Sequence, residues 1–349
     1  MICAIDFGSC WIRSVFRKPE TPDRLAMYSE KSEYALLTNS EHHRRTLDDQ
    51  QIPFAECEGA LVVVGNNSAK AQFLSRVPCT ALLTDGIVPA DDPPARQMLS
   101  VLTEAMLPPL SGSSNLCAIT VPGLRDGSEQ AERNEEFLCR LVRMRGYRTV
   151  VVNPAEAALV ATCSDASFTG ISIVMGAETT TICVARYGMP IAAETIAVGS
   201  NWIDSEIARH FRVQTWDDEG ICYLDLESVR QWKQAGNVHL RNALGDRERM
   251  MARLYSVALD RVSRTVAQML TSTTVRNALQ RQRLSVMLSG GAVMVDGFPS
   301  LLTERFIEHD VAERILSVRI SSDPATAVIR GSLILAELES RALSVEEAA

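Results

Sequence analysis

The sequence lacks the long apolar segments that mark membrane-spanning and secreted proteins. In its 349 residues no apolar run reaches the roughly 18 residues that a membrane-spanning helix needs. The chain begins directly with an apolar strand, without the charged segment and apolar stretch of a signal peptide. We therefore expect a soluble protein, with peripheral attachment to a membrane as the alternative.

Patterns for metal binding and nucleophilic catalysis are also missing. The nine cysteines form no CxxC pair, and His42 and His43 stand in a polar stretch beside two arginines, which is typical of a solvated loop. The sequence shows neither a zinc-ligand spacing nor a Ser-His-Asp order. Most cysteines lie inside apolar segments, as Cys117 and Cys183 do, so we expect buried, reduced thiols and a reducing cytoplasm.

An excess of basic charge is absent as well. The chain carries 35 Lys and Arg residues against 43 Asp and Glu residues, which gives a formal net charge of -8. Because the basic residues are scattered, they form no electrostatic footprint for DNA or RNA, and we expect no nucleic acid partner. The length suits about two domains, and a protein of this size buries roughly 75% of its unfolded surface.

The most informative feature that the sequence does contain is a duplication. Residues 3–9 (CAIDFGS) and 172–180 (SIVMGAETT) lie about half a chain apart, and each places an apolar strand before a turn of small residues. A second apolar strand follows each turn, at 12–16 and 181–187. The amides of such a turn face one spot, so two turns of this kind can hold a phosphate chain between two domains.

Strands and helices alternate around these turns. In the first half we predict strands at 61–65, 116–121 and 148–152, and helices at 94–106 and 128–145. In the second half we predict a helix from Asn153-Pro154 to 163, strands at 170–175, 179–187, 190–198 and 284–288, and a long helix at 247–272. Asp323 and Pro324 are typical of the N-cap and first position of a last helix, toward residue 341. This alternation favours a layered α/β fold.

A third segment, residues 288–297 (LSGGAVMVDG), completes a set of motifs. Together the three segments resemble the phosphate-1, phosphate-2 and adenosine motifs of the actin, heat-shock-chaperone and sugar-kinase ATPases. The chain is most similar to the bacterial actin MreB, because residues 64–71, 85–88, 120–122 and 323–328 also resemble that branch. The resemblance covers residues 1–336 and depends on the order and spacing of the motifs.

The resemblance implies a duplicated actin-like (ribonuclease-H-like) α/β fold, in which two domains enclose a central nucleotide cleft. Domain I would comprise residues 1–152 together with a C-terminal helix at about 324–341. Domain II would comprise residues 153–323 and include a small subdomain at about 205–256.

The resemblance also implies ATP and magnesium as ligands. Asp6 would hold the magnesium through water, while Gly8, Ser9 and Cys10 would offer backbone amides to the β-phosphate. Arg13 stands where actins carry a phosphate-binding lysine, although an exposed strand arginine is the alternative. The other binding positions implied are Gly176, Ala177, Thr179, Thr180, Gly199, Lys233, Gly290, Gly291 and Ala292.

The second phosphate motif departs from the family pattern. Val174 replaces an aspartate that would order magnesium, and Ala177 and Glu178 replace glycines. A Cβ atom disfavours the positive φ angles that let backbone approach phosphate. A carboxylate about 4 Å from a phosphate oxygen would cost about 4 kcal/mol at an effective dielectric constant near 20. Glu178 therefore opposes nucleotide binding unless it points away or pairs with Arg13.

The residue expected to assist hydrolysis is altered too. Asn153 stands where MreB has the glutamate that orients the attacking water, and an amide cannot take a proton as a carboxylate can. The alternative is structural, with Asn153 as a helix N-cap, Pro154 at the first helical position and Glu156 at the third. We therefore expect at most a slow ATPase.

The function that the resemblance implies is that of an MreB-like cytoskeletal protein, which binds ATP, assembles into filaments and acts in cell shape. Such a protein is cytoplasmic or peripheral at the inner membrane, and its partners are further copies of itself and membrane-associated morphogenesis or assembly proteins. One alternative is a pseudo-ATPase assembly scaffold resembling PilM or FtsA, since residues 176–180 resemble the PilM version of the second turn. Another is a chaperone-like ATPase domain.

Overall fold

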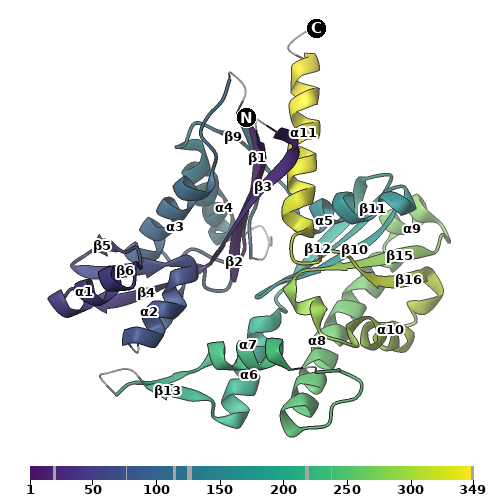
Figure 1. Ribbon diagram of the computed structural model, residues 1–349. Coiled ribbons are helices and arrows are strands. Elements are labelled where there is room, and N and C mark those ends of the chain that lie inside the picture. The colour runs from purple at the N-terminus through teal and green to yellow at the C-terminus, as the bar shows by residue number, and fades with distance from the viewer. Residues whose placement is uncertain are drawn as a thin grey trace.

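The computed structural model describes residues 1–18, 21–75, 77–112, 115–123, 128–216, 220–236 and 238–346. Two five-stranded sheets with the same strand order dominate it (Figure 1). The first has the order β3-β2-β1-β8-β9, and the second has the order β12-β11-β10-β15-β16. The strands of the first are β1 (Ile2–Phe7), β2 (Trp11–Lys18), β3 (Thr21–Lys31), β8 (Leu116–Thr120) and β9 (Arg148–Val151). Those of the second are β10 (Gly170–Met175), β11 (Thr180–Arg186), β12 (Met189–Ile196), β15 (Leu284–Ser289) and β16 (Ile315–Ile320).

The two sheets repeat each other in register as well as in order. In the first sheet Asp6 of β1 pairs with Arg13 of the antiparallel β2 and with Thr120 of the parallel β8. In the second sheet Val174 of β10 pairs with Thr181 of β11 and with Ser289 of β15. Central strands such as β8, β10 and β15 are buried along their whole length, as expected of strands covered on both faces. The duplication predicted from the sequence is therefore confirmed.

The remaining elements of the first half form a small sheet and the helices beside it. The small sheet has the order β5-β6-β4-β7. Its strands are β4 (Glu33–Thr38), β5 (Ala55–Cys57), β6 (Ala60–Val64) and β7 (Cys79–Ala81), and the helices are α1 (Glu41–Asp49), α2 (Ser68–Ser75), α3 (Pro93–Met106) and α4 (Glu129–Arg143). The amphipathic patterns predicted α3 and α4 to within two residues at each end.

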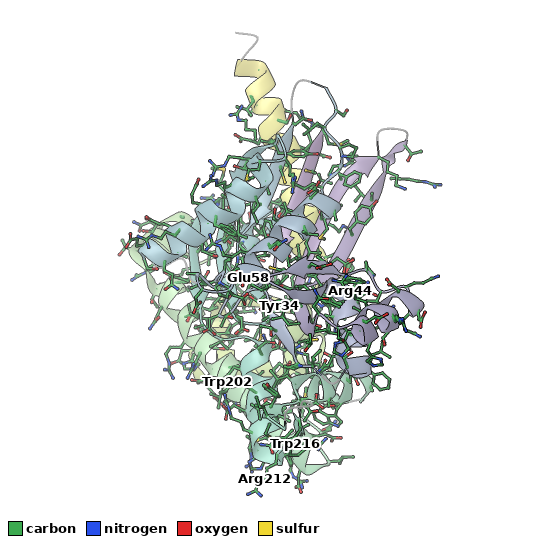
Figure 2. The ribbon with its side chains drawn as sticks, turned by 90° about the vertical axis from the view of Figure 1, so that its left-hand side faces the viewer. Tyr34, Arg44, Glu58, Trp202, Arg212 and Trp216 are labelled. Atoms are coloured by element: carbon green, nitrogen blue, oxygen red, sulfur yellow. The ribbon has the colours of Figure 1, made fainter. Side chains whose placement is uncertain are left out.

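The second half carries its own insertion. After α6 (Ser200–Phe211) come the hairpin β13 (Gln214–Trp216) and β14 (Cys222–Leu224) and the helix α7 (Leu226–Ala235). The helices α8 (Asp246–Thr271), α9 (Thr273–Leu279) and α10 (Phe298–Glu308) follow. In Figure 2, Trp216 and Arg212 mark the lower end of the molecule, below Tyr34 of the small sheet. The small subdomain expected at 205–256 includes residues 217–219 and 237, which lie outside the described residues.

Two helices each pack on the sheet that belongs to the opposite half of the chain. The helix α5 (Pro154–Thr162) follows the first sheet in the chain, yet its buried Ala155, Ala158 and Leu159 pack on the second sheet. The helix α11 (Ala327–Glu346) follows the second sheet, yet its buried Ile329 and Leu333 pack on the first, and it stands beside that sheet in Figure 1. On this basis we propose the domain division expected from the sequence, with residues 1–152 and the last helix in one domain and 153–323 in the other.

The start of the last helix differs from the prediction. Asp323 and Pro324 do not form its N-cap and first position, because α11 begins at Ala327. Instead the carbonyl oxygen of Pro324 accepts a hydrogen bond from the Gly290 amide at 2.7 Å. The Asp323 carboxylate accepts a hydrogen bond from the Thr326 hydroxyl. This contact with the Gly290 turn keeps the chain out of the helix until residue 327.

The described residues agree with the expected cysteine chemistry. All nine cysteines are free thiols, and six of them are buried. Burial raises the pKa of several, such as Cys183, whose pKa is raised to about 12 by desolvation first and by nearby Glu156 and Cys163. Within the described ranges, no helix is long and apolar enough to span a bilayer.

The crossing of α5 and α11 generates a stability prediction. A Cβ atom on Gly331 would lie 1.8 Å from the carbonyl oxygen of Ala157, so Gly331→Ala forces the two helices apart. We expect a loss of about 3 kcal/mol in the free energy of unfolding, measured by chemical denaturation. The exposed neighbour provides the control, since Arg330→Ala should stay within about 0.5 kcal/mol of the wild type. Equal stability of Gly331→Ala and the control would show that the crossing tolerates an added methyl group.

Candidate functional site

The two duplicated turns close in the same way. The Gly8 amide donates to the Trp11 carbonyl at 3.1 Å, and the Gly176 amide donates to the Thr179 carbonyl at 2.9 Å. A Cβ atom on Gly8 would lie 2.6 Å from that Trp11 oxygen, and one on Gly176 would lie 3.2 Å from the Thr179 oxygen. The first turn therefore requires a glycine at its first position, whereas an added Cβ at Gly176 would make a tight contact.

The amides at the tip of each turn have no protein partner. Within the described part of the chain, the backbone N–H groups of Ser9, Cys10, Ala177 and Glu178 donate to no protein acceptor. Four unpaired amides on two facing turns are the arrangement that binds an anion such as a phosphate group.

Contacts with α6 set the direction of the second turn. The carbonyl oxygens of Gly176 and Ala177 accept hydrogen bonds from the amides of Ser200 at 3.1 Å and Asn201 at 2.8 Å. In a trans peptide the N–H group points opposite to the carbonyl, so the following amides point away from α6. Gly199 makes this approach possible, because a Cβ atom there would lie 2.2 Å from the Ala177 oxygen.

A cavity of about 770 Å³ lies between the two turns. Residues of both sheets and of the second-half insertion line it. Those expected from the sequence and found in its wall are Asp6, Gly8, Ser9, Cys10, Arg13, Gly176, Ala177, Thr179, Lys233, Gly290, Gly291 and Ala292. Three other expected residues, Thr180, Gly199 and Asn153, are not part of the wall. Thr180 is buried, and its hydroxyl donates to the Val198 carbonyl at 2.7 Å.

Asp6 and Arg13 face the first turn from adjacent strands. Burial raises the pKa of the Asp6 carboxyl, while a hydrogen bond from the Thr120 hydroxyl at 2.5 Å and the charge of Arg13 oppose that rise. The Arg13 guanidinium carbon lies 5.6 Å from the centre of the Trp11 ring, a cation–π contact that keeps the side chain at the cavity wall. A carboxylate and a guanidinium thus meet beside the unpaired amides.

The departures in the second turn have a different effect from the one expected. Neither Ala177 nor Glu178 has a positive φ, so the expectation that their Cβ atoms would strain the turn is wrong. Glu178 does not pair with Arg13. Its carboxylate accepts a hydrogen bond from Asn201 Nδ2 at 2.5 Å. Burial raises the pKa of Glu178, and the bond from Asn201 opposes that rise.

Asn153 has the structural role that the sequence offered as an alternative. Its side-chain oxygen accepts hydrogen bonds from the amides of Ala155 at 2.9 Å and Glu156 at 3.2 Å, with Pro154 at the start of the helix. The N-cap prediction is confirmed. An oxygen already occupied by two amides is poorly placed to orient a water molecule, and only Pro154 of this pair reaches the cavity wall.

A buried ion pair forms the wall near α6 and α7. Lys233 Nζ lies 2.6 Å from Asp204 Oδ1, and the Asp204 side chain is 1% exposed. Arg230 places its Nε 3.8 Å from the other Asp204 oxygen. Lys233 is therefore held by a carboxylate of its own chain.

One end of the cavity is formed by residues around the Gly290 turn. Gly290 has a φ of 94°, and a Cβ atom there would lie 2.2 Å from the Met175 carbonyl oxygen. The short helix η3 (Gly291–Met294) follows, and the buried Tyr255 hydroxyl donates to the Ala292 carbonyl at 3.1 Å. Met294 also lines this end. A flat, weakly polar group such as a nucleobase would suit it.

Some residues of the site were not predicted. Thr120 lies outside the cavity wall and donates to Asp6, and its register opposite Asp6 follows from two adjacent parallel strands. Thr181 and Thr195 line the cavity, and their hydroxyl oxygens lie 3.2 Å apart. The signal for Thr181 was the threonine run after the second turn. Asn201 and Tyr255 gave no local signal, because their partners are remote in the chain.

Comparisons with known proteins agree with this architecture. A family model described as Volactin matches residues 1–336. Among curated proteins, none matches the sequence.

Solved structures resemble the whole chain. A structure of a MamK double helical filament has a TM-score of 0.68 at 15% identity, covering 96% of this chain and 98% of that one. MreB5 of Spiroplasma citri bound to AMPPNP has a TM-score of 0.68 at 16% identity, covering 99% and 98%. The ethanolamine utilization protein EutJ from Carboxydothermus hydrogenoformans has a TM-score of 0.50 at 16% identity, covering 95% and 89%. The predicted duplicated, actin-like α/β fold is confirmed.

The buried ion pair generates a prediction. Asp204→Asn leaves the Lys233 charge without its partner, so we expect a loss of about 3 kcal/mol in the free energy of unfolding. Asp246→Asn is the matched control, because Asp246 pairs with Arg249 at 2.6 Å on an 82% exposed side chain. The control should change stability by less than about 1 kcal/mol. Urea denaturation of both variants measures the difference, and equal losses would contradict the burial argument.

Proposed function

This chain belongs to the Volactin family, and from that premise we propose that it is an actin-like protein that binds ATP with magnesium and assembles into filaments. The observation that carries the proposal is the pair of duplicated turns, with four unpaired amides facing one cavity of about 770 Å³. A cavity of that volume accommodates a nucleotide. The turns come from the two duplicated sheets, so a phosphate chain between them would contact both halves of the protein.

The similar structures support the same proposal. One of them is a filament of MamK, and another is MreB5 bound to AMPPNP. At 15% and 16% identity they show the fold, and from it we propose nucleotide binding and filament formation for this chain.

The residues present fit a magnesium ion that is bound mainly by water and phosphate. Among the described residues, no three side chains of the ligand-forming types lie close enough together to hold a metal by themselves. Asp6 would hold the ion through its water molecules, which is the usual mode for magnesium beside phosphates. When bound, magnesium would offset the part of the phosphate charge that Arg13 and the amides do not neutralise.

We further propose that hydrolysis is slow or absent. Val174 occupies the register position in the second sheet that Asp6 holds in the first, so the second turn lacks an equivalent carboxylate. Asn153 is engaged as a helix cap. The paired hydroxyls of Thr181 and Thr195 can orient a water molecule but are poor proton acceptors at neutral pH.

The biological setting is proposed from the same likeness. We propose a cytoplasmic filament protein that acts in cell shape, with further copies of itself and membrane-associated assembly proteins as partners. On α2, the side chains of Phe73 and Leu74 are exposed, Phe73 by 86%, and they offer an apolar contact for a membrane surface or a partner.

Nucleotide binding is testable at Arg13. Arg13→Gln removes the guanidinium beside the first turn, and we expect about tenfold weaker ATP binding, which corresponds to about 1.4 kcal/mol. Titration calorimetry with ATP and magnesium measures the change. Arg133→Gln, on the exposed face of α4, is the control and should bind as the wild type does. Equal affinities for the two variants would remove Arg13 from the site.

Filament formation and hydrolysis are tested together. We expect high-speed pelleting and negative-stain images to show polymers with ATP and magnesium, and fewer of them after magnesium is chelated. In the same samples we expect phosphate release slower than that of an ordinary bacterial actin. Turnover at that ordinary rate would contradict the proposed loss of hydrolysis, and a protein that stays in the supernatant under all conditions would contradict the filament proposal.

A further inference from the structure

Four charged side chains join the two halves beside the cavity, whose wall includes one of them, Arg230. Lys31 Nζ at the end of β3 lies 3.3 Å from Glu227 Oε1 on α7. Arg230 Nη1, also on α7, lies 4.0 Å from Glu33 Oε2 at the start of β4. We call Lys31, Glu33, Glu227 and Arg230 the cross-cleft bridge. Their side chains are between 14% and 26% exposed, so water screens them less than it screens fully exposed pairs.

The first-half side of the bridge is attached to the first phosphate turn. Ser32 lies between Lys31 and Glu33, and its amide donates to the Cys10 carbonyl at 3.0 Å. The Ser32 carbonyl in turn accepts from the Leu82 amide at 2.9 Å, which ties the segment to the small sheet. A movement of the Cys10 turn therefore moves Lys31 and Glu33 with it.

The second-half side is attached to the second phosphate turn through one amide side chain. Arg230 Nη2 donates to Asn201 Oδ1 at 3.2 Å, and Asn201 Nδ2 donates to Glu178 Oε1 at 2.5 Å. Asn201 thus connects the guanidinium of the bridge to the tip of the turn. The Glu178 side chain, which has no place in a phosphate site, finds its role here.

We propose that the cross-cleft bridge and a nucleotide phosphate bound between the two turns stabilise each other, so that the bridge slows nucleotide release. This inference rests on the proposed nucleotide binding. A phosphate chain that contacts both turns draws them together, and each turn carries one side of the bridge. Closing the bridge likewise brings the turns to the separation that the phosphate requires, and linkage makes the effect reciprocal.

Other ion pairs adjoin the cross-cleft bridge or lie within it, and they leave it balanced in charge. Lys233 and Asp204 form their own pair at 2.6 Å, and Arg230 Nη1 also lies 3.9 Å from Glu227 Oε2 on the same helix. Lys31 also lies 3.4 Å from Glu33. The carboxylates of Glu33 and Glu227 raise the pKa of Lys31, although desolvation, the largest single effect, acts in the opposite direction. Each side of the cleft therefore presents both signs of charge to the other.

Release of AMPPNP tests the proposal. In stopped-flow displacement of a fluorescent AMPPNP analogue, we expect Lys31→Met and Glu227→Gln each to accelerate release about fivefold, or about 1 kcal/mol. The double variant should release no faster than either single variant, because both changes remove the same Lys31–Glu227 contact across the cleft. Lys18→Met, at the exposed end of β2, is the matched control and should release at the wild-type rate.

Hydrogen exchange measures the coupling without relying on release. In the protein without nucleotide, we expect Lys31→Met to accelerate amide exchange in α7, which belongs to the other half of the chain. Adding AMPPNP to the wild type should slow exchange there. A wild type that binds no AMPPNP would refute the proposed function together with this coupling. Binding of AMPPNP with unchanged release and unchanged α7 exchange in Lys31→Met would refute the coupling alone.

Discussion

The crossing of α5 and α11 is the contact on which the rest of the structure depends. Gly331 and the Ala157 carbonyl meet so closely that no side-chain atom fits between them. Through this crossing α11 packs Ile329 against the first sheet, and α5 packs Leu159 against the second sheet. The contact between these helices sets the separation of the two sheets. It therefore also sets the separation of the two turns, which lie at the ends of strands in these sheets.

The two ends of the interface between the halves have different physical character. At the helix crossing the contacts are short-range packing of small side chains, which loses its energy over a fraction of an ångström. At the cross-cleft bridge the contacts are ionic, and their energy falls off slowly with distance. They can therefore weaken and re-form without a large cost. One end is therefore suited to fixing the geometry and the other to changing it. In Figure 1, α11 lies in the upper part of the molecule and α7 in the lower part.

Local chemistry predicted much of this fold and part of the site. The two turns were predictable because glycine followed by small residues between apolar strands is typical of a tight turn. Asn153-Pro154 predicted a helix start because an N-cap residue followed by proline is typical of one. The predicted start of α11 was wrong because the Pro324 carbonyl accepts a hydrogen bond from the amide of Gly290, which is remote in sequence. The role of Glu178 was hidden likewise, because Asn201 reaches it only after α6 has packed on the turn. A contact between side chains that are remote in sequence produces no periodic pattern in the sequence.

The exchange of α5 and α11 has a consequence for how the protein is made. During synthesis the helix that covers the face of the first sheet with Ile329, Leu333 and Ala336 is translated only after the whole of the second sheet. Until then Ala4, Val15 and Ala118 have no permanent cover. The first sheet therefore completes its core only after the second sheet has been made, and the chain must keep that apolar face from other surfaces until then.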